Sequence, residues 1–232
     1  MSSEQSIIGD NLASVLSKIE DASRRVGRDP AEVRLVAVTK YAELNWVKHL
    51  IQSGIKTLGE SRPQQLTERA ALLGDSIEWH LIGHLQRNKV RLILPHVSLI
   101  HSVDSLRLLR RIDEISAEMS LSPRVLLEVN TTGEKSKDGF SIDALMRDWE
   151  QILHCKSVNV SGLMTMARES DDPEEARSTF SSLRQLRDEL SSRPNSPQLP
   201  ELSMGMSGDY QVGIEEGATL VRIGSALFDG LQ

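Results

Sequence analysis

Short apolar runs recur along the chain, and longer stretches with helical spacing separate them. In the first run, VRLVAVTK, apolar residues continue almost without interruption until Lys40, which is typical of a strand buried on both faces. The apolar runs span residues 33–40, 55–60, 77–84, 98–105, 124–130, 158–166, 201–207 and 220–228. The stretches with helical spacing include residues 44–54, 104–120 and 171–193. The pattern predicts that strands and helices alternate about eight times.

Strict alternation of strand and helix predicts parallel strands joined by right-handed helical crossovers. About eight such units in a chain of 232 residues favour an α/β fold of the (β/α)8 TIM-barrel type. A doubly wound open sheet is the alternative. Against it, the first strand is not followed by the G-x-G-x-x-G turn of dinucleotide-binding folds.

An amphipathic helix is expected ahead of the barrel, at about residues 5–27, where a glycine and then a proline end it. The strands and helices of the barrel then occupy about residues 33–230. Residues 191–201 are rich in serine and proline and predict a loop, because only one or two further units follow them. We therefore expect residues 1–232 to fold as a single barrel domain.

Composition narrows the function classes. Hydrophobic residues make up 39% of the chain and aromatic residues only 3%, so the core must be aliphatic. The net charge is −6 and no basic stretch dominates, which argues against a nucleic-acid partner. The chain shows no signal peptide and no apolar run of membrane-spanning length, so we expect a cytoplasmic protein without a membrane partner. The single cysteine, Cys155, excludes an internal disulfide and is expected to lie buried within a helix.

The ends of the predicted strands carry the candidate chemistry, because the loops after barrel strands form the active face of this fold. Lys40 ends the first strand, where its amine could act as a charge partner or as a Schiff-base nucleophile. Ser207 and Gly208 follow the seventh strand, and Gly224 and Ser225 follow the eighth. Barrels frequently bind phosphate at these two places, so the sequence predicts a phosphate site opposite the lysine.

Among the other polar residues, one arginine needs a partner, and the histidines and a serine do not match the patterns of a metal site or a hydrolase. Arg222 lies within the last apolar run, and a buried guanidinium must find a partner. His80, His84 and His101 lack the dense pattern of cysteine, histidine and carboxylate ligands that a metal site needs, so no metal is expected. Ser207 is not part of a G-x-S-x-G elbow, which removes the main argument for a hydrolase.

The strand ends also carry a set of longer motifs. These are LVAVTK, GES, WHLIGHLQRNK, HSVDS, GLMTM, LSMGMSGDY and VRIGSALF. Together they closely resemble the pyridoxal phosphate homeostasis protein family, from about residue 33 to residue 230. The resemblance implies a barrel similar to the N-terminal domain of alanine racemase.

The resemblance also implies roles for individual residues. Lys40 would form a Schiff base with pyridoxal 5′-phosphate (PLP), and Arg222 would face the pyridine nitrogen of this vitamin B6 cofactor. Ser61 stands where the family motif has an asparagine, so a single hydroxyl replaces an amide near the cofactor. Lys137, in EKSKDGF, is expected near the barrel mouth. The residues that would hold the phosphate are Ser207, Gly208, Gly224 and Ser225.

The function that the resemblance implies is PLP homeostasis: holding the cofactor and buffering it or delivering it to apo PLP-dependent enzymes, without substrate turnover. A racemase-like enzyme on the same barrel is the alternative. The resemblance implies that such an enzyme takes a catalytic tyrosine from a second domain of the partner subunit, whereas this chain stops after the eighth unit and contains only Tyr41 and Tyr210. We therefore expect a monomer that is not an enzyme. A regulatory interaction protein, in which PLP only stabilises the fold, stays open.

Overall fold

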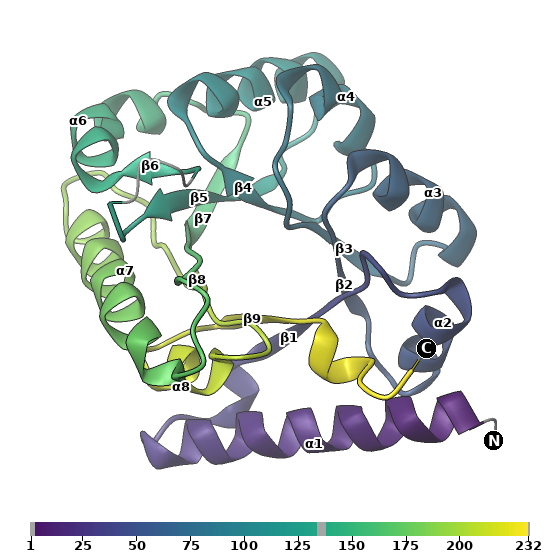
Figure 1. The fold of residues 1–232 in the computed structure, drawn as a ribbon. Coiled ribbons are helices and arrows are strands. Elements are labelled where there is room, and N and C mark those ends of the chain that lie inside the picture. Colours follow the sequence, from purple (N-terminus) through teal and green to yellow (C-terminus); the bar gives the residue numbers. More distant parts are fainter. Residues whose placement is uncertain (1–2, 134–137, 232) are drawn as a thin grey trace.

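The computed structural model describes residues 3–133 and 138–231, and its parallel strands close into a barrel (Figure 1). Within these residues, eight strands form a ring, because β9 pairs with β1 and β4 pairs with β5. A ninth strand, β6, pairs in parallel with the C-terminal end of β5. The strands are β1 (Arg34–Val38), β2 (Thr57–Glu60), β3 (Glu78–Leu81), β4 (Leu99–Val103), β5 (Arg124–Asn130), β6 (Phe140–Ser141), β7 (Asn159–Met164), β8 (Glu201–Ser203) and β9 (Leu220–Ile223). The predicted barrel is confirmed, and the doubly wound sheet is excluded because that sheet has free edges.

Helices surround the barrel and connect its strands (Figure 1). They are α1 (Ser3–Arg25), α2 (Leu44–Gln52), α3 (Pro63–Leu73), α4 (Val90–Ile93), α5 (Leu106–Met119), α6 (Ile142–Leu153), α7 (Arg177–Ser191) and α8 (Tyr210–Glu215). A short 3-10 turn, η4 (Ser225–Leu227), follows β9. Within the described residues, no helix is long and apolar enough to cross a membrane.

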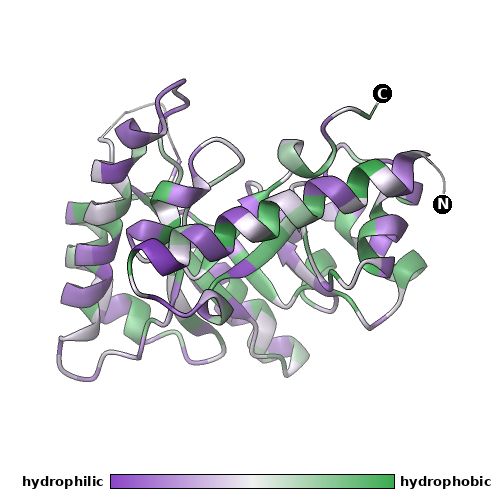
Figure 2. Cartoon of the chain, turned by 90° about the horizontal axis from the view of Figure 1, so that it is seen from below, coloured by the Kyte–Doolittle hydropathy of each residue, from purple (hydrophilic) through white to green (hydrophobic). Residues whose placement is uncertain are grey.

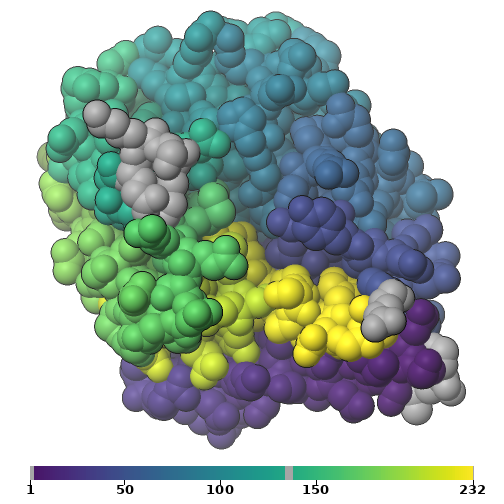
Figure 3. Space-filling model, in the orientation of Figure 1, coloured from purple at the N-terminus to yellow at the C-terminus, as the bar shows by residue number. Residues whose placement is uncertain are grey.

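The helix α1 packs across one side of the barrel, as Figure 2 shows. Its buried apolar positions recur every three or four residues and are Ile8, Leu12, Val15, Ile19 and Ala22. It ends just before Gly27, whose φ of 69° suits the left-handed turn that reverses the chain. On its inner face, the Asn11 amide donates to the carbonyl oxygens of Leu227 (3.3 Å) and Asp229 (2.9 Å). The N-terminal helix therefore holds the turn that follows the last strand, and the two segments touch in Figure 3.

The barrel interior is layered from one end to the other. An apolar layer is formed by Val36, Leu99, Leu126, Met164 and Leu220. At the N-terminal ends of the strands, an ion-pair group that we call the basal cluster joins four charged side chains. They are Arg34, Glu78, Arg124 and Glu201. These two layers close the lower end of the barrel, so any ligand must approach from the C-terminal ends of the strands.

Candidate functional site at the barrel mouth

Lys40 lies at the barrel mouth, two residues beyond the end of β1. Its side chain is exposed, and the Nζ atom lies 4.9 Å from the centre of the Tyr41 ring. Within the described residues this ammonium group has no ion-pair partner, so it is free to meet a ligand. The next helix, α2, begins at Leu44. The intervening residues, 39–42, form a turn that we call the lysine turn.

A buried arginine fixes the lysine turn from below. Arg69 on α3 donates to the carbonyl oxygens of Thr39 (2.7 Å) and Ala42 (2.6 Å) and also pairs with Glu60 at the end of β2. The Thr39 hydroxyl donates to the same Glu60 carboxylate at 2.6 Å. Lys40 is therefore presented on a rigid support. The sequence gives little sign of this, because an arginine in a polar helix usually indicates a solvated face.

Ser207 and Gly224, which come from the loops after β8 and β9, meet at the mouth. The Ser207 hydroxyl oxygen accepts from the backbone N–H groups of Gly224 (3.3 Å) and Ala226 (3.4 Å). Gly208 and Ser225 are exposed beside them, and a Cβ atom at Gly208 would meet nothing within 4 Å. We call this group, in which two backbone N–H groups converge on one hydroxyl, the cradle. An anion here can accept from the serine hydroxyl and can replace the serine oxygen as the acceptor of the two N–H groups.

Arg222 lies deeper in the barrel and is only 4% exposed. One Nη atom donates to the Ser203 hydroxyl (2.6 Å) and the other to the Thr165 carbonyl oxygen (3.0 Å). Burial lowers the pKa of Arg222 to about 10, opposed by the negative charges of Asp209 and Glu128. The guanidinium therefore keeps its proton at neutral pH and places a fixed positive charge under the mouth.

Glu128 on β5 is a further buried acid near the mouth, and the sequence motifs do not indicate it. It is 5% exposed. Burial, helped by the negative charges of Asp104 and Asp138, raises its pKa from 4.5 to about 7. A carboxyl group with this pKa changes between its protonated and its charged form near neutral pH.

Glu128→Gln should stabilise the fold at high pH. Between pH 4.5 and about 7 the folded protein keeps the Glu128 proton while the unfolded chain has released it, so the free energy of unfolding falls as the pH rises through this window. Glutamine does not titrate. The free energy of unfolding of Glu128→Gln, relative to that of the wild type, should therefore rise by about 3 kcal/mol between the lower and the upper end of this pH window. Urea denaturation on either side of the window measures this. The exposed Glu150→Gln is the control, and an advantage of Glu128→Gln that does not change with pH would refute the explanation.

The remaining residues singled out from the sequence include Ser61, which directly follows β2 at the same end of the barrel as Lys40. Ser61 is half-buried, and its backbone packs so closely on Gly83 that a Cβ atom there would collide with it. Lys137 is outside the described residues. His80 and His101 lie in the barrel interior and bond to each other (2.9 Å), whereas His84 is exposed and faces Asp104. Within residues 3–133 and 138–231, no three potential ligands come together around a metal position.

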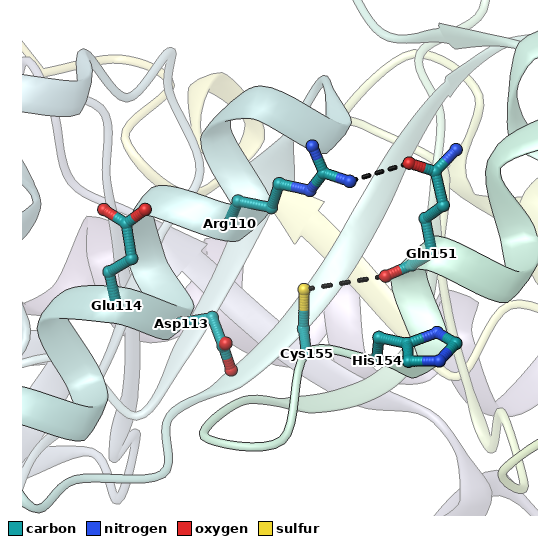
Figure 4. Close-up of a pocket in the computed structure, with 6 residues that line it drawn as sticks. All are labelled: Arg110, Asp113, Glu114, Gln151, His154 and Cys155. Atoms are coloured by element: carbon teal, nitrogen blue, oxygen red, sulfur yellow. Dashed lines mark hydrogen bonds between the residues drawn. The ribbon is translucent and has the colours of Figure 1, made fainter.

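A surface pocket of about 290 Å³ lies away from the mouth, between α5 and α6 (Figure 4). It is lined by Arg110, Asp113, Glu114, Gln151, His154 and Cys155. The prediction that Cys155 lies buried within a helix is wrong: α6 ends at Leu153, and the thiol is half-exposed beyond it. The helical spacing continues past the point where the chain turns towards β7, which explains the error.

Comparisons with known proteins place the chain among related barrels. The family model "Alanine racemase, N-terminal domain" matches residues 11–231. The pyridoxal phosphate homeostasis protein of Aquifex aeolicus is 40% identical to it, over 94% of this chain and 96% of its own length. The chain is also similar to the structure of PipY from Synechococcus elongatus with PLP bound, at 33% sequence identity and a TM-score of 0.83 over 95% of this chain and 99% of PipY.

An alanine racemase of Clostridium difficile has the same fold but little sequence similarity. Its TM-score is 0.70 at 14% identity, and the match covers 94% of this chain and 56% of the racemase. At this identity the likeness concerns the barrel alone.

Proposed function

We propose that this chain, which belongs to the pyridoxal phosphate homeostasis protein family, holds PLP at its barrel mouth without turning over a substrate. The observation that carries the proposal is the cradle. The Ser207 hydroxyl and two backbone N–H groups converge just beyond the strand that bears the buried Arg222. A phosphate group is a strong hydrogen-bond acceptor and matches these donors in hydrogen-bonding type.

Each residue of the mouth has a role in this proposal. Ser207, Gly208, Gly224 and Ser225 bind the phosphate, and Arg222 faces the pyridine ring. PLP supplies an aldehyde, and condensation of that aldehyde with the Lys40 amine forms a C=N bond and releases one water. The lysine turn is held by Arg69 and Glu60, which fixes the backbone from which the Lys40 side chain extends. Ser61 contributes at most one hydroxyl.

A holding role is favoured over catalysis by the charge state of Arg222. With a pKa of about 10, its guanidinium stays protonated and cannot readily pass a proton to a ring nitrogen. An unprotonated pyridine withdraws electrons weakly, which disfavours carbanion chemistry on a bound amino acid. The curated relatives agree, since they are named for homeostasis and not for a reaction. A racemase-like enzyme is the alternative.

Release to other proteins completes the proposal. A free amine or amino acid can displace Lys40 from the carbon of the aldehyde, after which only the phosphate and ring contacts retain the cofactor. We propose apo PLP-dependent enzymes as transient recipients and a monomer as the acting form.

Absorbance spectroscopy tests this function. PLP added to the purified protein should produce a visible band, and borohydride should then attach a pyridoxyl group to the peptide that contains Lys40. Sensitive racemase and transaminase assays on the loaded protein should detect no turnover. The absence of a band at saturating PLP would refute the binding role, whereas robust racemisation of an amino acid would favour the enzyme.

A further inference from the structure

A series of hydrogen bonds crosses the barrel interior and connects the basal cluster with Arg222. From the Glu78 carboxylate it passes to His80 Nε2 (3.3 Å), and from His80 Nδ1 to His101 Nε2 (2.9 Å). From His101 Nδ1 it passes to the Ser203 hydroxyl (2.8 Å), which accepts from Arg222 (2.6 Å). We call these five residues the interior network. They come from β3, β4, β8 and β9, so they connect side chains across the inside of the barrel.

Four of the five members of the interior network are deeply buried, and Glu78 at its lower end is partly exposed. His80, His101 and Ser203 are fully inaccessible to solvent, and the two imidazole rings lie with centres 5.0 Å apart. Burial lowers the pKa of both histidines, so both are neutral. Polar groups in such a place destabilise a fold unless every one is hydrogen-bonded, and apolar side chains would fill the same volume at lower cost. Stability alone therefore does not explain the network.

The chemistry of the two ends fixes the direction of every hydrogen bond. Arginine can only donate, so the Ser203 oxygen accepts from Arg222 and its own hydrogen points to His101 Nδ1. The hydrogen bond from His80, together with the charge of Arg34, lowers the pKa of Glu78 to about 2, so its carboxylate can only accept. Between these ends, each neutral histidine must carry its proton on Nε2 and donate towards Glu78.

We propose that Ser203, His101 and His80 are positioning residues for Arg222, which hold its guanidinium in one orientation by connecting it to the basal cluster. This inference deepens the proposed function and rests on it for its ligand. Two N–H groups of Arg222 are used by Ser203 and Thr165, and in the proposed function other N–H groups of the guanidinium face the ring of PLP. Affinity for PLP, and the spectrum of the bound cofactor, should therefore depend on side chains that touch no ligand.

Ser203→Ala tests the proposal, because it removes one oxygen atom and interrupts the network next to Arg222. We expect PLP affinity to fall about tenfold, as for loss of a hydrogen bond to a charged group, and the visible band to shift. Ser23→Ala is the matched control: Ser23 is equally buried, and its hydroxyl bonds only within α1, to the carbonyl oxygen of Ile19. If Ser203→Ala shares the affinity and spectrum of Ser23→Ala, the positioning role is wrong.

Nitrogen NMR of the ligand-free protein gives a second readout that does not need PLP. In the wild type, His80 and His101 should both be neutral with the proton on Nε2, and Ser203→Ala should shift the signals of both rings and of the Arg222 side chain. A proton on Nδ1 in the wild type, or unchanged histidine and arginine signals in the variant, would overturn the proposal. If the wild type binds no PLP, the proposed function fails, and these NMR signals still decide whether the network positions Arg222.

Discussion

Lys40→Ala will abolish the covalent attachment of PLP and leave the barrel folded. The lysine side chain is exposed and makes no ion pair within the described residues, so its loss should change the free energy of unfolding by less than about 0.5 kcal/mol. The amine is nevertheless the nucleophile of the proposed function, and no backbone or hydroxyl group can replace it. The visible band and the borohydride-stable adduct should both disappear.

One further variant distinguishes the nucleophilic role of the Lys40 amine from its positive charge, and a second serves as a control. Lys40→Arg keeps a positive charge at the mouth but offers no nucleophile at neutral pH, so it should also lack the adduct while retaining some PLP through the cradle. Lys48→Ala removes an exposed lysine from α2 and should behave as the wild type. A persistent adduct on another lysine in Lys40→Ala would contradict the assignment, and so would collapse of its fold, measured by circular dichroism.

Arg222→Ala should weaken both PLP retention and stability. Truncation leaves a cavity and removes the donors to Ser203 and Thr165, which together should cost about 4 kcal/mol of the free energy of unfolding. Losing the hydrogen bond from a charged group to the ligand should lower PLP affinity by about a hundredfold. Urea denaturation and spectral titration measure the two effects separately.

Arg222→Met distinguishes the contribution of the Arg222 side chain to packing of the barrel from its contribution to PLP binding. Methionine fills most of the volume and removes a charge that burial disfavours, as the lowered pKa of Arg222 shows. It should therefore recover much of the stability lost in Arg222→Ala but none of the affinity. Arg110→Ala, which removes an exposed arginine at the surface pocket, should alter neither. If Arg222→Met binds PLP as tightly as the wild type, Arg222 is only a structural residue.

Much of the fold was predictable because barrels alternate strongly apolar strands with amphipathic helices, and both periodicities are visible locally. Strand ends then locate the mouth, which is how Lys40, Ser207, Gly224 and Arg222 are predicted as site residues from the order of residues. The interior network was not predictable. His101 and Ser203 are separated by 102 positions, and only the stagger of the closed barrel brings them to the same height. The same limit applies to Arg69, whose partners lie on two other segments.

The contact between Asn11 and the turn after β9 determines when the site can exist during protein synthesis. Asn11 on the first helix bonds to residues 227 and 229, and β1 pairs with β9. These contacts of the N-terminal segment can form only after the C-terminal segment has been synthesised. Half of the cradle also comes from these late residues. A chain that still lacks these residues has no complete cradle, so the proposed phosphate site forms only after β9 has joined β1.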